Sequence, residues 1–236
     1  MVQYWPSLNE NHVEFIKAQP LFFVASAPLA GRHCNLSPKG HPNRSLAILD
    51  ATTVAYLDAT GSGCETISHI YENGRVTVMF CSFGTSPKIM RLFCTGKVVE
   101  RDDDRFETLR RSMGPQIELM GQRAIILLHV FKVQTSCGFA VPLIGQQDGE
   151  HSEHTEEKDL ETQQFVNRDT LDNWATKMME KDALLGFQKN LNFQSLDGLP
   201  GMRSARRARG QWMAFENLKA RMRRVGHQWD AVLVGV

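Results

Sequence analysis

The clearest candidate site for chemistry in this sequence is a glycine-rich turn, 60–64, followed by a short predicted helix. Ser62 stands three residues before Glu65, the spacing of an N-terminal capping box, and Gly74 is suited to end the helix. The first turn of a helix leaves backbone N–H groups unpaired and carries a partial positive charge, so it suits a phosphate group. The alternative is an ordinary capped helix between two strands, since most capped helices bind no anion.

Two cationic side chains near predicted strands are further candidates for binding an anion. Lys39 follows the predicted strand 33–38, and it is either a solvated loop lysine or an anion clamp. Arg91 interrupts the apolar run 89–99, where an unpaired buried charge would be costly. Arg91 therefore lies at the rim of the sheet or has a partner. Composition alone does not choose between the alternatives for Lys39.

The composition is that of a globular protein, with 236 residues, 42% hydrophobic residues and a net charge of +1. This charge gives no overall bias towards nucleic acid or membrane. No apolar run approaches the roughly 20 residues of a membrane span, and no signal peptide is expected at the N-terminus. The five cysteines are scattered without a CxxC pair, which predicts reduced thiols, a cytoplasmic protein and no metal site.

The elements that must position these residues are mostly strands joined by short turns. Strands are predicted at 21–27, 33–38, 46–49, 53–57, 75–83, 89–99 and 123–137. Helices are predicted at 7–18, with Ser7 and Glu10 as its capping pair, then after the glycine turn and at 102–113. Because no regular helical crossovers separate the strands, we expect an antiparallel barrel with attached helices.

The C-terminal part differs in composition, so we expect a domain at 1–145 and an extension at 146–236. The stretch 146–164 is acidic and predicts a flexible linker or an exposed loop. A helix is predicted at 167–189, and a basic helix follows at 203–224 with eight arginines and lysines against one glutamate. Such a charged face is usually solvated, so nucleic-acid binding is the weaker alternative.

Three of these stretches, in their order and spacing, resemble a known family. They are Asn35-Leu36-Ser37-Pro38-Lys39-Gly40, the turn and helix 60–70, and the strand Arg91-Leu92-Phe93-Cys94-Thr95-Gly96-Lys97-Val98. Together they resemble the pyridoxamine 5′-phosphate oxidase-like, FMN-binding split-barrel proteins over about Phe15 to Pro142. The stretch Ser195–Gly201 is similar to a C-terminal extension in a fungal and plant branch of that family.

The resemblance implies a six-stranded antiparallel split β-barrel of the α+β class, with flanking helices and a helical C-terminal extension. It also implies a homodimer with FMN at the interface. It assigns the cofactor to seven positions: Asn35, Ser37 and Lys39 along the ribityl chain and phosphate, Ser62, Glu65 and Thr66 at the helix start, and Arg91 as a further cation. Lys39 and Arg91 are therefore expected on one phosphate.

The function that the resemblance implies is a flavin-dependent oxidoreductase acting on a small molecule. The alternative is a non-catalytic protein that binds a flavin or another small ligand. The vitamin-converting oxidases of the family carry an Arg-x-His pair near the C-terminus, and the segment 203–209 lacks such a histidine. The substrate and the catalytic residues are therefore not assigned from the sequence.

Overall fold

The computed structural model describes residues 2–144 and 165–227, which divide into two compact units. We call Met1–Arg168 the barrel unit and Asp169–Val236 the helical unit. The acidic linker predicted at 146–164 lies outside the described residues.

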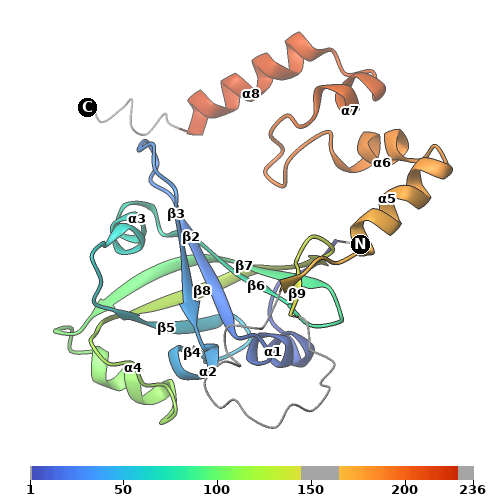
Figure 1. The fold of residues 1–236 in the computed structure, drawn as a ribbon. Coiled ribbons are helices and arrows are strands. Elements are labelled where there is room, and N and C mark those ends of the chain that lie inside the picture. The colour runs from blue at the N-terminus through green and yellow to red at the C-terminus, as the bar shows by residue number, and fades with distance from the viewer. Residues whose placement is uncertain (1, 145–164, 228–236) are drawn as a thin grey trace, which may run out of the picture. The chain divides into compact units, whose positions relative to one another are not determined.

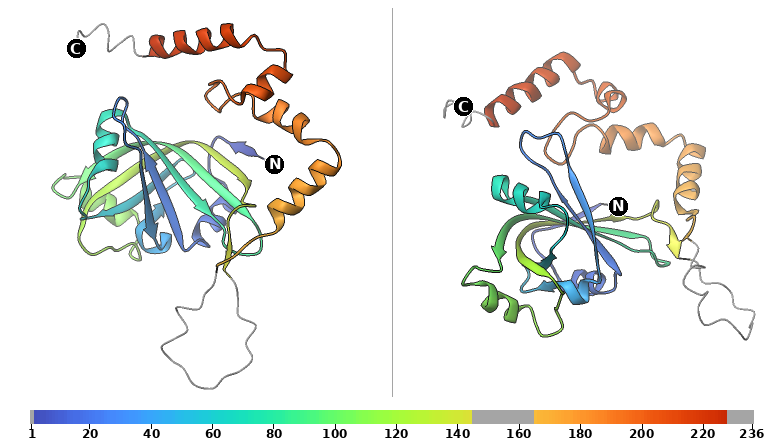
Figure 2. Two further views of the ribbon diagram at one scale, coloured as in Figure 1. Left: turned by 45° about the horizontal axis from the view of Figure 1, so that its top comes forward. Right: turned by 60° about the vertical axis from the view of Figure 1, so that its left-hand side comes forward.

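The main sheet in the described part of the barrel unit has eight antiparallel strands (Figures 1 and 2). The strand order is β3-β2-β6-β7-β8-β5-β4, and β1 pairs with β8. The strands are β1 Gln3–Trp5, β2 Leu21–Ser26, β3 Asn35–Gly40, β4 Leu46–Ile48, β5 Thr53–Ala59, β6 Arg75–Cys81, β7 Lys88–Glu100 and β8 Gln122–Cys137. The sheet curls into a half-barrel, which confirms the predicted α+β split-barrel class. The short β1 and β4 add to the six strands expected.

The main core fills the concave side of this sheet. Strand residues alternate between the two faces, and in β2 buried Phe22 and Val24 alternate with partly exposed neighbours. Phe22 packs edge-on against Tyr56 of β5, with ring centroids 5.9 Å apart. A second cluster lies on the other face of β5 and β8, where Phe106 of α4 packs among their apolar side chains.

Within residues 2–144, four helices flank the sheet: α1 Glu10–Lys17, α2 Pro42–Ser45, α3 Glu65–Asn73 and α4 Phe106–Ser112. Helix α3 packs on β2 and β7 and ends at Gly74, which has a φ of 69°. A residue with a side chain is strained in this left-handed region, so the predicted role of Gly74 is confirmed.

Helix α1 begins two residues later than its predicted capping pair allows. Asn9, not Ser7, is the N-cap: its side chain accepts from the backbone N–H of His12, and the backbone N–H of Asn9 donates to His12 Nδ1. His12 is buried and packs edge-on against Trp5 at 4.6 Å. The predicted Ser7–Glu10 capping box was therefore wrong.

The cap at His12 should make folding stability depend on pH. Burial, and then the charge of Lys88, lower the pKa of His12 below its usual 6.5. As pH falls, His12 therefore becomes protonated in the unfolded chain before it does so in the folded protein. The contribution of neutral His12 to folding stability is present in full above pH 6.5 and is lost as pH falls through the folded pKa.

His12→Gln keeps a side-chain acceptor for the N-cap but cannot be protonated. Urea unfolding at neutral pH and at about pH 5 should show the wild type losing about 1 kcal/mol more than His12→Gln, the usual contribution of one hydrogen bond. Equal losses in both proteins would contradict this role of His12.

The last described segment of the barrel unit is fixed by a buried arginine. Strand β10, Phe165–Val166, pairs with β9, Leu143–Ile144. Two residues later, the Arg168 guanidinium donates to the backbone carbonyls of Val141, Thr85 and Gly84, at 2.9, 3.0 and 2.6 Å. Arg168 therefore anchors the chain to the β6–β7 turn.

The helical unit contains α5 Thr170–Glu180, α6 Leu184–Leu191, α7 Arg203–Ala208 and α8 Met213–His227. The helix predicted at 167–189 is divided at Asp182, which has a φ of 47°. The basic helix predicted at 203–224 is divided at Gly210, with a φ of 71°. Between α6 and α7 the chain doubles back, and Gln194 pairs with Pro200 in an isolated bridge.

Candidate functional site

Strand β3 carries a row of three polar side chains on one face. Asn35, Ser37 and Lys39 are partly buried, and the residues between them are exposed. They pair across the ladder with the inward-facing Ser26, Val24 and Phe22 of β2. Because residues opposite each other in a ladder share a face, the row points to the concave side of the sheet.

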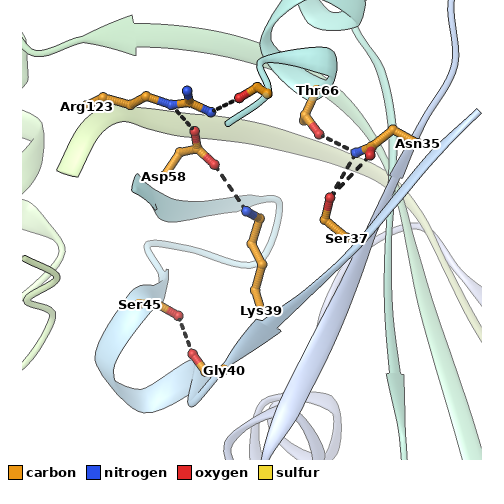
Figure 3. Close-up of polar contacts among 9 residues, drawn as sticks. Asn35, Ser37, Lys39, Gly40, Ser45, Asp58, Thr66 and Arg123 are labelled. Atoms are coloured by element: carbon orange, nitrogen blue, oxygen red, sulfur yellow. Dashed lines mark hydrogen bonds and ion pairs between the residues drawn. The ribbon is translucent and has the colours of Figure 1, made fainter. Parts of the chain in front are cut away.

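Asn35 joins this row to the first turn of α3 (Figure 3). Its Nδ2 donates to Thr66 Oγ1 at 2.9 Å and to Ser37 Oγ at 3.0 Å. One turn further along α3, His69 Nδ1 lies 2.9 Å from Ser26 Oγ. The start of α3 is thus held against the β2–β3 hairpin, which brings three of the predicted residues together.

Lys39 belongs to a cluster of three charges. Its Nζ lies 3.1 Å from Asp58 Oδ1, and Arg123 Nε lies 2.8 Å from Asp58 Oδ2. The Asp58 side chain is 7% exposed, whereas those of Lys39 and Arg123 are 22% and 29% exposed. The carboxylate therefore lies between the two cations (Figure 3), and the cations are more exposed to solvent than the carboxylate is.

The ion pair of Lys39 with Asp58 closes the split in the barrel. It joins β3, at one edge of the sheet, to β5, which lies near the other edge. The ammonium also lies 5.3 Å from the centre of the Tyr56 ring, a cation–π distance. Burial raises the pKa of Tyr56 well above its usual value, so this phenol stays neutral.

A β-bulge aims Arg123 at this cluster. Asp58 pairs with Ala124, but the next residue, Ala59, pairs with Gln122, so Arg123 is the extra residue of β8. Bulges redirect side chains in this way. The guanidinium then also donates through Nη2 to the carbonyl of Gly63 at 2.8 Å.

The glycine turn does not have the predicted capping box. Helix α3 begins at Glu65 after Cys64, and no side chain bonds to the N-cap position. Ser62 is exposed in the preceding bend. The Glu65 carboxylate instead folds back over Gly63, where an added side chain would collide with it. Backbone N–H groups at the helix start consequently have no side-chain cap.

Arg91 lies on the opposite face of the sheet from Lys39. Arg91 pairs with Met79, Met79 pairs with Phe23, and Phe23 pairs with Pro38 of β3, so these four residues share one face of the sheet. Pro38 stands between Ser37 and Lys39 and faces outward, away from the concave side. Arg91 Nη1 donates to Gln134 Oε1 at 3.3 Å. Within one chain, the structure therefore does not bring the two predicted phosphate cations together.

Sequence reasoning missed Asp58 and Arg123. Asp58 is the next-to-last residue of the apolar strand β5, which leads into the glycine turn, and Arg123 stands at the start of the last long strand. A charge at each strand end was the available signal. Their partnership depends on the bulge and on the curl of the sheet, which no local pattern specifies.

The remaining features of the described residues do not indicate a second site of comparable chemistry. A hollow of about 540 Å³ lies between α1, α2 and the loop after α4, and is lined by Ile16, Leu46 and Ile117 among others. In the described part of the chain no three His, Cys, Asp or Glu side chains gather as metal ligands. Among its helices, none has the length and apolarity needed to cross a membrane.

Comparison with known proteins identifies the family. Residues 8–137, more than half of the chain, match the profile described as pyridoxamine 5′-phosphate oxidase. This chain belongs to the pyridoxamine 5′-phosphate oxidase family. It is 49% identical over 210 residues to the pyridoxamine 5′-phosphate oxidase family protein ustO of Aspergillus flavus, covering 89% of this chain and 82% of that one. The barrel unit has 168 residues, so this match extends into the helical unit.

Solved structures similar to this pyridoxamine 5′-phosphate oxidase family member are more distant. HupZ of Group A Streptococcus is 21% identical, with 53% of this chain and 91% of that chain covered and a TM-score of 0.42. A putative pyridoxamine 5′-phosphate oxidase from Lactobacillus delbrueckii is 22% identical, with 55% and 94% covered and a TM-score of 0.42. An FAD-binding protein from Mycobacterium smegmatis is 12% identical, with 56% and 97% covered and a TM-score of 0.37.

Proposed function

We propose that this chain binds FMN and is a flavin-dependent oxidoreductase acting on a small molecule. One observation carries the proposal: in a member of this family, the cations of the Lys39–Asp58–Arg123 cluster adjoin the polar row of β3 and the uncapped start of α3. A phosphate group is bound by helix N–H groups, hydroxyl donors and cations, and this region supplies all three.

The donor set fits both polar parts of FMN. The Lys39 ammonium offers more N–H donors than its contact with Asp58 uses, so it can also bind a phosphate oxygen. Asn35, Ser37 and Thr66 carry an amide and hydroxyls that can exchange hydrogen bonds with the ribityl hydroxyls. Ionised Glu65 is an acceptor only, so it would suit a hydroxyl rather than the phosphate.

The roles of these residues are binding and orientation. Bound FMN would supply the electron transfer, since in such enzymes the cofactor carries the redox chemistry. Lys39 would neutralise the phosphate, and the tie between Asn35 and Thr66 would hold β3 and α3 at a fixed separation around it. No residue is assigned as a catalytic acid or base.

We infer that the protein is a homodimer. The outer face of β3, β2, β6, β7, β8 and β1 carries Arg91 together with exposed apolar side chains, including Leu36 at 62% and Tyr4 at 49%. A second copy that covers this face would bury these groups and bring a second Arg91 to the interface. Sedimentation at micromolar concentration should give a dimer, and a monomer that still binds FMN tightly would contradict the inference.

The function is tested by titrating FMN and riboflavin into the purified protein and following flavin fluorescence. A phosphate site predicts that FMN binds at least about tenfold more tightly, because riboflavin lacks the charge-assisted bonds. The visible spectrum of the protein as isolated should also show bound flavin. Absence of binding by both compounds would contradict the proposal.

A non-catalytic flavin-binding protein is the second candidate. It is favoured by the charged cluster at the proposed site, because Lys39, Asp58 and Arg123 are paired with one another and these three residues are therefore suited to binding rather than to proton transfer. Reduction of the bound flavin by NAD(P)H, followed by reoxidation in air, would support the enzyme. A flavin that binds but is never reduced would support the binding protein.

A further inference from the structure

We propose that Arg123, rather than Arg91, is the second cation of the flavin phosphate site, and that Asp58 is the residue that positions Arg123 and Lys39. This inference rests on the proposed function. It assigns binding to a residue outside the three family stretches and gives the carboxylate between the cations a definite role.

The first argument is the shared carboxylate. Lys39 and Arg123 contact different oxygens of Asp58, at 3.1 and 2.8 Å, so one short side chain determines where both cations lie. Two positive charges and one negative charge leave the cluster with a net charge of +1. Such a cluster attracts an anion, while the carboxylate reduces the repulsion between the cations.

The second argument is exposure. Asp58 is almost fully buried, and both cations are between a fifth and a third exposed. The guanidinium of Arg123 donates through Nε to Asp58 and through Nη2 to Gly63. Its Nη1 has no acceptor among the described residues, so it can donate to a bound ligand. Planar guanidinium groups with unused N–H donors suit phosphate oxygens.

The third argument is the position of Arg123 beside the glycine turn. Its bond to the Gly63 carbonyl puts the guanidinium against the turn that leads into α3. That turn and the uncapped helix start are the other groups expected to bind the phosphate. Arg91, by contrast, faces the convex side of the sheet, so in the same chain it cannot join Lys39 on one phosphate.

The test compares the wild type with Arg123→Ala and Arg123→Lys, and with Arg91→Ala as the variant of the competing assignment. FMN and riboflavin are titrated into each protein, with flavin fluorescence as the readout. Arg123→Ala should weaken FMN binding by about tenfold to a hundredfold and leave riboflavin within about twofold. Arg123→Lys should be intermediate, and Arg91→Ala should leave the ratio of the two affinities unchanged.

Asp58→Asn tests the positioning role. This change raises the net charge of the cluster from +1 to +2, so an effect of charge alone would increase the preference for FMN over riboflavin. If Asp58 positions the cations, the preference should fall instead, because neither cation keeps its anionic partner. A preference that rises or stays the same would overturn the role given to Asp58, and thermal unfolding would verify that the variant is folded.

The outcomes separate this inference from the proposed function. If the wild type bound neither flavin, or bound both with equal affinity, the proposed phosphate site would be contradicted, and the inference would fail with it. A clear wild-type preference for FMN that survives Arg123→Ala and disappears in Arg91→Ala would overturn only the assignment of Arg123. The loss of preference in Arg123→Ala alone would support it.

Discussion

Replacing Lys39 with methionine should weaken FMN binding by about ten- to a hundredfold, which corresponds to the loss of one charge-assisted hydrogen bond of about 1.5–3 kcal/mol. Methionine keeps an unbranched apolar stem beside the Tyr56 ring, so the change removes mainly the charge. Asp58 keeps Arg123 as its partner, and the core beneath should remain packed. The measurement is a fluorescence titration with FMN.

Riboflavin is the control for Lys39→Met. Because riboflavin has no phosphate, its affinity should change by no more than about twofold. The unfolding midpoint in urea should identify any loss of folding. If Lys39→Met weakened riboflavin as much as FMN, the lysine would serve the closure of the barrel rather than the phosphate.

Gly201→Ala should disrupt the helical unit, at a cost of several kcal/mol, because there is no space for a side chain. An added Cβ would collide with the carbonyl of Asn192 and lie 2.7 Å from the carbonyl carbon of Phe193. These are backbone atoms that cannot turn aside. The same backbone is held by bonds from Gly201 N to Phe193 O and from Met202 N to Asn192 O, both 2.8 Å.

Gly186→Ala is the matched control in the same unit. Gly186 lies in α6 with open space around its Cα, and alanine is the better helix former, so stability should stay equal or rise by up to about 1 kcal/mol. Hydrogen exchange should show lost protection across α6 and α7 in Gly201→Ala and none in Gly186→Ala. Unchanged protection in Gly201→Ala would contradict the tight packing of this turn.

The sequence by itself determined the fold class and the family. Alternating and continuous apolar runs located the long strands, since side chains in a strand alternate between its faces. Short turns between them excluded parallel crossovers, and the glycine after α3 predicted the end of that helix. The ordered stretches around Asn35, the glycine turn and Arg91 were sufficient to indicate the family that the comparisons then confirmed.

Helix starts were decided by tertiary contacts. Ser7 and Ser62 have the right spacing for capping boxes, yet α1 is capped by Asn9 with His12, and α3 has no side-chain cap. Burial of His12 against Trp5 stabilises the later start of α1, and the sequence spacing does not describe that packing. In α3, the contact between Asn35 and Thr66 holds the first turn in place instead.

The composition of the charged cluster was decided only by the tertiary structure. Asp58 and Lys39 are separated in the sheet by four strands, and they meet because the sheet curls until its two sides approach each other. Arg123 joins them because a single extra residue in β8 changes the direction of its side chain. Arg91 is excluded because a ladder pairs residues of the same face, and a shift of one position along a strand transfers a side chain to the other face.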